Sequence, residues 1–378
     1  MAREGFGRMK YLHIVPGADD VANGMARVAR LLAKEQGDAV VVDLSAVSGQ
    51  SLAVSEGSES LGFVESLEEV WVHGMWLPKE WAICRRVIKA GKRLVRMTHG
   101  SLSPVYLKNQ SPIKKWLVGP IERYWLRKAD RIVATCDAEK AWIEAYLGKR
   151  CPEIVVEDIK RFFKLGVRSQ ELGVRVSAPC GCSQPIGTRA SRATARPSQE
   201  LGVSEGFSRK ERKDRKENEG NGSKQEIGNK KLNVLYLGRR HPLKGVEYLE
   251  KAVKELGVRS QGLVVSEDGP SSSKLETINT KHETRDIELK IVSNAFGEEL
   301  EKVWEWCDVL VLSTLSENFG LVVAEALERG KCVITTDGAP AWGDGNDYGG
   351  RLMYLKGYRD GSDEERIKLL KDALMMMV

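Results

Sequence analysis

Short apolar runs alternate with longer amphipathic stretches in two parts of this chain, and the pattern predicts strands that alternate with helices. In the first part, we expect strands at 10–15, 40–44, 70–73, 93–97 and 131–135 and helices at 25–36 and 81–90. In the second part, we expect strands at 233–237, 289–293, 309–312 and 332–336 and helices at 246–256, 300–306 and 321–329. This alternation indicates parallel sheets with helices on both faces, and therefore an α/β protein with two doubly wound, Rossmann-like domains.

The hydrophobic periodicity is lost between these two parts, at 165–231, where Arg, Ser, Gly, Glu and Lys dominate. We interpret this stretch as a low-complexity, disordered insert or linker, with one domain at 1–164 and the other at 232–378. Short words such as Leu-Gly-Val-Arg-Ser-Gln recur in the chain at irregular spacing. Because surface loops accept added residues at modest entropic cost, we expect further loop inserts near 48–62 and about 257–286.

The net charge and the cysteines limit the kinds of protein that this chain could be. The net charge is +6, but the segment from Lys164 to Lys231 alone holds 15 basic and 8 acidic residues, so the remainder is close to neutral. We therefore expect no nucleic-acid partner, although a nucleic-acid-binding protein that uses the insert is an alternative. The seven cysteines are odd in number and scattered, which favours reduced thiols in the cytoplasm. Cys180 and Cys182 form the only close pair and lack neighbouring ligands, so we expect no metal site.

Candidate chemistry begins where the loop at 313–320 leads into the predicted helix at 321–329. Backbone N–H groups near Phe319, Gly320 and Leu321 have no partner within such a helix and lie at the positive end of its dipole. They can therefore bind a phosphate or a diphosphate. Glu325 follows one turn later on the same face as Leu321, where it could accept hydrogen bonds from sugar hydroxyls. The alternative is an ordinary surface glutamate near a helix start.

A second loop with suitable chemistry spans 238–245 and follows another predicted strand of the second domain. In open parallel sheets, ligands bind beyond the carboxyl ends of the strands, where both loops are expected. Arg239 and Lys244 place two cations on this loop, which would neutralise a diphosphate opposite the helix start. Arg240 is an alternative phosphate ligand. With Glu317 and Glu325, the two cations describe a pocket for a nucleoside diphosphate sugar.

These motifs resemble the group 1, or family 4, retaining glycosyltransferases of GT-B fold. The resemblance covers about 10–164 and 232–372, and its first-domain strings are similar to bacterial members that build lipopolysaccharide and other surface glycans. The motifs are Gly238-Arg239 with Lys244-Gly245, Ser316 to Leu327 with seven residues between Glu317 and Glu325, Gly338-Ala-Pro340, Val95 to Pro104 around His99, and Ala134 to Glu139.

The resemblance implies a hexosyl transfer with retention of configuration, from a nucleoside diphosphate sugar bound by the second domain. The acceptor, bound on the first domain, would be a lipid-linked molecule or a polysaccharide, and neither a metal nor another cofactor would be required. The implied catalytic residues are Glu317, at the transferred sugar, and His99, which reaches it from the first domain. The implied donor-binding residues are Arg239 and Lys244 for the diphosphate, Glu325 for the ribose, the backbone of Phe319, Gly320 and Leu321, and Gly24 in the first-domain glycine loop.

Two further expectations concern where in the cell the protein acts and which other functions it could have. The chain has no run of eighteen apolar residues, and its first residues lack the apolar segment of a secretory signal. A basic helical stretch at 112–128, interrupted at Gly119-Pro120, carries Trp116, Tyr124 and Trp125 and suits peripheral contact with the inner face of the cytoplasmic membrane. The alternative is a helix that packs its aromatic residues inward. A nucleotide-sugar epimerase of the same fold and a non-catalytic glycan- or nucleotide-binding module are the alternative functions.

Overall fold

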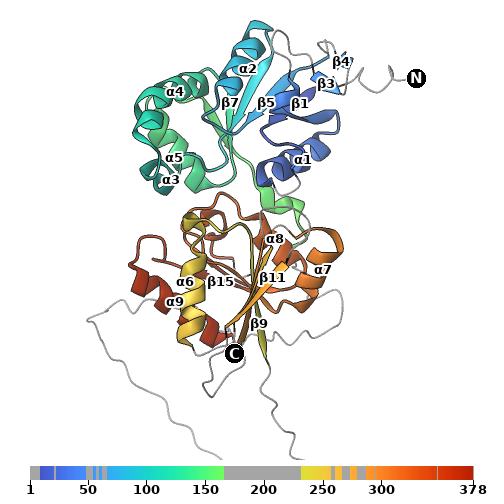
Figure 1. The fold of residues 1–378 in the computed structure, drawn as a ribbon. Coiled ribbons are helices and arrows are strands. Elements are labelled where there is room, and N and C mark those ends of the chain that lie inside the picture. The colour runs from blue at the N-terminus through green and yellow to red at the C-terminus, as the bar shows by residue number, and fades with distance from the viewer. Residues whose placement is uncertain are drawn as a thin grey trace, which may run out of the picture.

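Two α/β domains with separate sheets form the molecule, and they lie one above the other in Figure 1. The computed structural model describes residues 9–20, 23–47, 66–165, 231–256, 287–293, 295–346 and 348–377, together with the backbone of strands at 54–56, 59–61, 260–265 and 273–278. The predicted disordered insert at 165–231 lies outside the described residues, apart from the residue at each end. The cysteines Cys84, Cys136, Cys151 and Cys307 are free thiols.

The first domain is built on a parallel sheet of six strands in the order β2-β1-β5-β6-β7-β8. The strands are β1 (Tyr11–Val15), β2 (Ala39–Asp43), β5 (Glu69–His73), β6 (Arg93–Met97), β7 (Arg131–Ala134) and β8 (Glu153–Val156). The helices are α1 (Gly24–Gln36), α2 (Pro78–Lys89), α3 (Pro104–Lys108), the π-helical η2 (Lys114–Val118), α4 (Gly119–Arg127) and α5 (Asp137–Leu147). A short 3₁₀ turn, η1 (Leu44–Ala46), follows β2.

The second domain has a seven-stranded sheet in the order β11-β10-β12-β9-β13-β14-β15, parallel except for the β10–β11 pair. The strands are β9 (Leu232–Leu237), β10 (Ser260–Val265), β11 (Ser273–Ile278), β12 (Ile287–Val292), β13 (Val309–Leu312), β14 (Cys332–Thr336) and β15 (Leu352–Leu355). The helices are η4 (Pro242–Lys244), α6 (Val246–Glu255), α7 (Gly297–Trp306), α8 (Leu321–Glu328), η5 (Pro340–Trp342) and α9 (Asp363–Met376).

These sheets confirm the predicted fold class of two Rossmann-like domains, and strands also occur in two stretches that the sequence analysis treats as loop inserts. The stretch at 257–286 carries β10 and β11, which extend the second sheet, and the stretch at 48–62 carries a small hairpin of β3 (Val54–Glu56) and β4 (Glu59–Leu61). Strands β8 and β15 were also not predicted. Both lie at sheet edges, where one side of the strand is unpaired and only part of its surface is buried, so their sequences carry a weaker hydrophobic signal.

One apolar cluster crosses from the first domain into the second and fixes how their loops meet. A connecting 3₁₀ helix, η3 (Ile159–Phe162), lies between the domains in light green in Figure 1. The buried side chain of Ile159 and the partly buried Phe163 join the cluster, and the Phe163 ring stacks on Phe319 with centroids 6.3 Å apart. Because Phe319 belongs to the loop that precedes α8, this packing holds that loop against the first domain.

A buried ionic cluster fixes the loop that follows β5 in the first domain. Arg96 and Glu122 are fully buried and 2.8 Å apart, and Arg96 also donates to the Gly74 carbonyl at 2.9 Å. Glu122 accepts a second bond from the backbone N–H of Trp76, which has the unusual φ of 80°. Glu80 is buried beside this pair, and its burial raises the pKa of the carboxyl from 4.5 to about 7.

We predict that Glu80→Gln removes part of the pH dependence of stability. A carboxyl whose pKa is raised by folding contributes stability below its ordinary pKa of 4.5, and this contribution is lost as the pH rises through about 7. The variant should therefore melt at a higher temperature than the wild type at pH 8. Its free energy of unfolding should exceed that of the wild type by about 3 kcal/mol at most. Thermal melting at pH 5 and pH 8 measures this, with the exposed Glu364→Gln as control. Equal pH dependence in Glu80→Gln and wild type would contradict the assignment.

Candidate functional site

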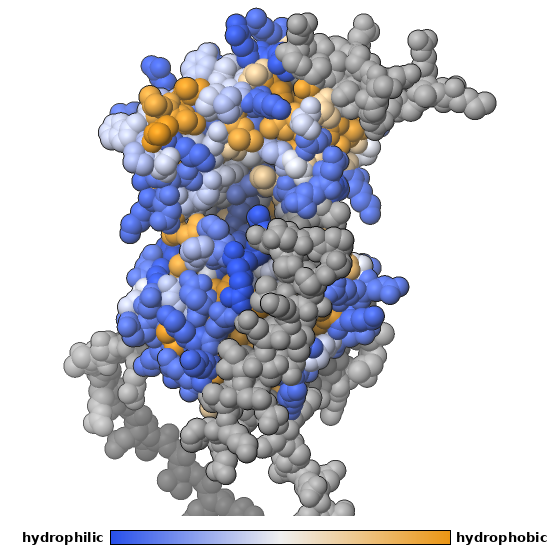
Figure 2. Space-filling model, viewed as in Figure 1, coloured by the Kyte–Doolittle hydropathy of each residue, from blue (hydrophilic) through white to orange (hydrophobic). Residues whose placement is uncertain are grey.

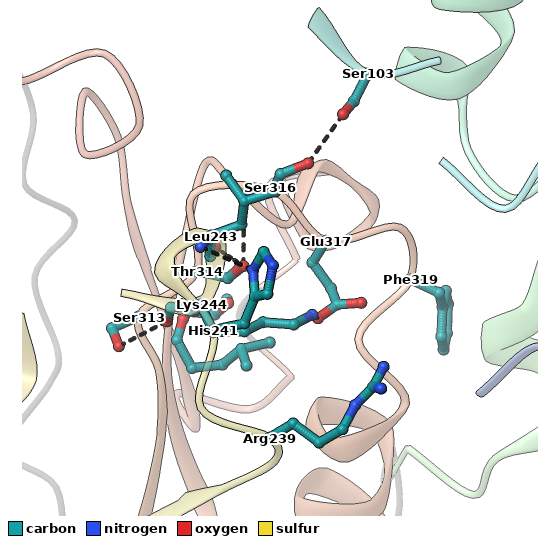
Figure 3. A network of polar contacts seen from close by, with 12 residues as sticks. Ser103, Arg239, His241, Leu243, Lys244, Ser313, Thr314, Ser316, Glu317 and Phe319 are labelled. Carbon is teal, nitrogen blue, oxygen red and sulfur yellow. Dashed lines mark hydrogen bonds and ion pairs between the residues drawn. The ribbon is translucent and has the colours of Figure 1, made fainter. Parts of the chain in front are cut away.

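Two loops at the carboxyl ends of β9 and β13 are hydrogen-bonded to each other along their backbones (Figure 3). The carbonyl of Leu243 accepts from the N–H of Leu315 at 2.8 Å and from the Thr314 hydroxyl at 3.0 Å. The Ser313 hydroxyl donates to the carbonyl of Gly245 at 3.0 Å. The loops that carry the predicted cations and Glu317 therefore form one connected unit.

Two glycines make this close approach possible. Gly245 has a left-handed φ of 59°, and a Cβ atom there would lie 2.2 Å from the carbonyl oxygen of Ser313. A Cβ atom at Gly338, in the loop after β14, would lie 2.1 Å from the carbonyl oxygen of Thr314. Gly338 also accepts from the N–H of Glu317 at 2.8 Å. Because no other residue fits at such distances, both glycines of the sequence motifs have a steric explanation.

The structure brings Lys244 and Glu317 of these two loops together. Lys244 forms an ion pair with Glu317, and both side chains are about three quarters buried, with exposures of 27% and 22%. Arg239 makes no ion pair within the described part of the chain, and its guanidinium extends toward the space beside Glu317 (Figure 3). The guanidinium of Arg240 forms an ion pair with Glu250, a residue of α6, at 2.6 Å. Arg239, rather than Arg240, is therefore available for a phosphate.

The start of α8 has the geometry expected for an anion site. Gly320 is the N-cap residue with a left-handed φ of 72°, and no side chain caps the N–H groups of the first turn. Phe319 is buried instead, with its ring against Phe163 and Trp342 and its carbonyl bound by the Trp342 indole N–H. The Phe319 side chain thus holds the loop, and the backbone of Gly320 and Leu321 supplies the donors.

Helix α1 of the first domain lies against the beginning of α8. A Cβ atom on Gly24 would lie 3.8 Å from the Leu321 side chain, so the backbone at Gly24 comes close to the predicted donor site. Glu325 is 7% exposed and forms an ion pair with Arg27, one turn into α1. Burial raises the pKa of the Glu325 carboxyl, and Arg27 opposes that rise. The predicted ribose ligand is therefore already paired across the domain interface.

The first-domain loop after β6 carries His99 and contacts the loop at 313–320. His99 has a φ of 50°, which is unusual for a residue other than glycine, and it is followed by Gly100, where a Cβ atom would lie 3.0 Å from Asn318. The Asn318 amide oxygen accepts from the Thr135 hydroxyl at 2.8 Å, and the Ser103 and Ser316 hydroxyls are 2.9 Å apart (Figure 3). His99 and the donor-side loop therefore lie on facing walls.

A buried carboxylate holds this first-domain loop in place. Glu139 on α5 is fully buried, and its oxygens accept from the Thr98 hydroxyl at 2.7 Å, the Gly100 N–H at 2.6 Å and the Thr135 N–H and hydroxyl, both at 2.8 Å. Glu139 thereby joins the loops that follow β6 and β7. It stands in the first-domain string that carries the family resemblance, but its sequence position alone gave no role to it.

Sequence reasoning also missed Arg27, Asn318 and the partners of His99. Arg27 lies three residues after Gly24 on the same helix, which is the only sequence signal for it. Asn318 lies within the quoted motif between Glu317 and Phe319. The His99 ring is hydrogen-bonded at 2.8 Å to His73, a residue of the predicted strand at 70–73, and burial lowers the pKa of His99 to about 3. His99 is therefore neutral at physiological pH.

A large cavity lies elsewhere on the domain interface. Its volume is about 1130 Å³, and it lies along the connecting segment. The residues that line it include Thr135 and Lys160 on one side and Asp344 and Tyr348 on the other. None of the predicted site residues lines it. The charge distribution, not cavity size, therefore locates the candidate site. In the described part of the chain, no group of three or more His, Cys, Asp or Glu side chains is placed to hold a metal ion.

The stretch at 112–128 is exposed along much of its length. The predicted interruption at Gly119-Pro120 is wrong, because the π-helical η2 runs directly into α4 and these are the first two residues of α4. Trp116 is 81% exposed and Tyr124 is 53% exposed, whereas Trp125 packs on the first-domain core. Figure 2 shows apolar residues gathered among hydrophilic ones at the upper left, over the position of α4 in Figure 1. No helix of the described residues is long and apolar enough to cross a membrane.

Two facing Rossmann-like domains, with a charged site where their loops meet, define a GT-B fold. Residues 218–343 match the family model described as "Glycosyl transferases group 1". A segment of 106 residues is 31% identical to an uncharacterized glycosyltransferase of Methanocaldococcus jannaschii, and this match spans only 27% of this chain and 26% of that relative. The family model supports the predicted resemblance to group 1 glycosyltransferases in the second domain.

A solved structure has the same fold over nearly the whole chain. Sucrose-phosphate synthase from Thermosynechococcus elongatus is similar with a TM-score of 0.52, over 97% of this chain and 90% of that chain, at 12% sequence identity. At this identity the likeness concerns the fold alone, and it agrees with the predicted GT-B architecture. Evidence about activity therefore comes from the charged residues of the two loops and not from this likeness.

We predict that Arg239→Ala weakens the binding of a nucleoside diphosphate by about tenfold or more, because it removes a charge-assisted contact to phosphate. Arg240→Ala is the matched control, since Arg240 is exposed and held by Glu250. Its loss should change binding by about twofold or less, as expected for an exposed ion pair. Calorimetric titration with UDP, GDP and ADP measures both. A larger loss in Arg240→Ala than in Arg239→Ala would reverse the assignment.

Proposed function

We propose that this protein is a retaining, metal-independent glycosyltransferase that moves a hexosyl group from a nucleoside diphosphate sugar to a lipid-linked or polysaccharide acceptor. The observation that carries the proposal is the convergence of Arg239, Lys244 and Glu317 in the loops next to Phe319 (Figure 3). In a GT-B fold, that location lies beyond the carboxyl ends of the second-domain strands, where open parallel sheets bind ligands. His99 stands in the first-domain loop that contacts Asn318 through Gly100.

The proposed role of the two cations is to stabilise the departing diphosphate. Transfer of a sugar develops negative charge on the leaving group, and fixed positive groups in a partly buried site stabilise such charge without reorganisation. Lys244 forms an ion pair with Glu317. A diphosphate would compete for Lys244 and release the Glu317 carboxylate toward the hydroxyls of the transferred sugar, while Arg239 and the N–H groups of Gly320 and Leu321 bind the phosphate oxygens.

The first-domain residues would act on the other end of the donor. A neutral His99 has one ring nitrogen left after its hydrogen bond to His73, and this nitrogen can bind a sugar hydroxyl near the reacting carbon. The α1 backbone at Gly24, close to the Leu321 side chain, would approach the phosphates of the donor. Glu325 would bind the ribose. Its carboxylate would then either contact the ribose and Arg27 together or leave the ion pair with Arg27.

We predict that Lys244→Ala and Glu325→Ala each lower turnover by at least about tenfold, because each removes a charged contact to the donor in the transition state. Lys371→Ala and Glu364→Ala, on α9 and away from the interface, are matched controls. Turnover is measured with a panel of UDP-, GDP- and ADP-sugars and membrane extracts as acceptor. Wild-type rates in both variants would exclude this site, and conversion of the donor without acceptor would indicate an epimerase instead.

The acceptor side of the proposal rests on the exposed apolar patch of η2 and α4. Ile113, Trp116 and Leu117 are 67%, 81% and 68% exposed and lie beside Lys114 and Lys115. A cavity of about 550 Å³ adjoins the patch, with its lining including Trp76, Lys108 and Arg123. Aromatic and apolar side chains flanked by cations suit the interface of an anionic membrane. A lipid-linked acceptor would be reached there, at the inner face of the cytoplasmic membrane, as in lipopolysaccharide synthesis.

We predict that the double variant Trp116→Ala, Leu117→Ala lowers sedimentation with phosphatidylglycerol vesicles by about fivefold or more, because burial of these side chains in the lipid interface is lost. Met376→Ala on α9, another exposed apolar position, is the control and should leave sedimentation unchanged. Wild-type protein should bind phosphatidylcholine vesicles weakly. If wild type and double variant sediment equally, the patch does not contact membranes.

A further inference from the structure

A line of hydrogen-bonded side chains leads from His99 into the first domain. The His99 Nε2 atom is 2.8 Å from Nδ1 of His73, whose Nε2 is 2.9 Å from Nδ1 of His13, whose Nε2 is 2.7 Å from the Gln36 amide oxygen. His13 and His73 are fully buried on the adjacent strands β1 and β5, and Gln36 is the last residue of α1. Three of the five histidines of the chain thus form one row.

We propose that Gln36, His13 and His73 are positioning residues that fix which ring nitrogen of His99 carries the proton and which is presented to the interdomain site. The inference rests on the proposed function for the effect on catalysis, but the tautomer itself is a property of the ligand-free protein. None of the three side chains would touch the substrate. They would act through the hydrogen bonds that hold the His99 ring.

The order of donors and acceptors follows from the Gln36 end. An amide oxygen only accepts, so the Nε2 atom of His13 must carry its proton, and the Nδ1 atom of a neutral His13 must accept. His73 then donates through Nε2 and accepts at Nδ1, which requires His99 to donate through Nε2. The Nδ1 atom of His99 is left with its lone pair, ready to accept a hydrogen bond from a sugar hydroxyl.

This order holds only while the rings are neutral, and their surroundings keep them so. Burial lowers the pKa of His13 to about 4 and that of His73 well below the ordinary value, with the neighbouring rings and Arg96 adding to the effect on His73. A protonated ring has two donors and no acceptor, so it would interrupt the row. His13 also stacks on Trp71 with centroids 4.9 Å apart, which restricts rotation of the ring.

The backbone of His99 is held as firmly as its ring. Its left-handed φ of 50° is unfavourable for a residue other than glycine, and the neighbouring Gly100 N–H and Thr98 hydroxyl are bound by the buried Glu139. A histidine that only filled space would need neither this backbone nor a defined tautomer. The fixed backbone and the fixed tautomer together indicate that the Nδ1 atom of His99 is held at one position as a hydrogen-bond acceptor.

Two substitutions at Gln36 separate this role from a structural one. Gln36→Glu keeps an acceptor at the end of the row, whereas Gln36→Lys offers only donors and reverses every hydrogen bond, so that His99 presents an N–H group instead. Gln36 is only partly buried at a helix end, so both variants should fold. At pH 8, where the rings are neutral, ¹⁵N spectra of histidine-labelled protein report the tautomer of each ring.

We expect the Nε2–H tautomer of His99 in wild type and Gln36→Glu, and the Nδ1–H tautomer in Gln36→Lys. Gln36→Lys should lower kcat/KM by about tenfold, as for loss of one hydrogen bond to the substrate, with Gln36→Glu close to wild type. In a His99→Asn background, the Gln36→Lys change should have no further effect. An Nδ1–H tautomer in wild type, or an unchanged tautomer in Gln36→Lys, would overturn the inference even if the protein is a glycosyltransferase. If the tautomers are as expected but no donor is turned over, the proposed function fails instead.

Discussion

The site depends on the contact between three loops at the carboxyl ends of β9, β13 and β14. At Gly245 and Gly338 the backbones approach so closely that any side chain would overlap a neighbouring carbonyl oxygen. This approach places Lys244 against Glu317, and Arg239 extends toward the space beside that pair (Figure 3). Without the two glycines, the loops would separate and the charges would no longer face one space.

The same loop unit, together with α8, also contacts the first domain. Asn318 and Ser316 bind Thr135 and Ser103, and Glu325 binds Arg27. The two predicted ligand carboxylates, Glu317 and Glu325, are thus each paired with a cation, whereas Arg239 makes no ion pair within the described residues. A diphosphate sugar would bring its own negative charge and hydroxyl groups, so its binding would be an exchange of partners within a prearranged site rather than the assembly of a new one.

Sequence analysis predicted the parts of this arrangement that depend on local order. Arg239, Lys244 and Glu317 each follow a strongly apolar strand, and parallel strands bring the loops at their carboxyl ends together, so their convergence could be expected. The edge strands β8 and β15 were missed because partial burial weakens their patterns. The pairings of Glu325 with Arg27 and of His99 with His73 and His13 join residues distant in sequence. Their partners depend on strand order and domain contact, which local patterns do not determine.

Whether the interdomain site binds a nucleoside diphosphate sugar can be measured by thermal melting of the protein in the presence of such donors. A ligand that binds the folded protein raises the melting temperature by mass action. We expect at least one of UDP-, GDP- and ADP-sugars to raise it in wild type, with the increase lost in a Lys244→Ala, Arg239→Ala double variant that melts normally alone. An equal increase in that double variant, or no increase with any donor in the wild type, would show that the interdomain site does not bind these donors.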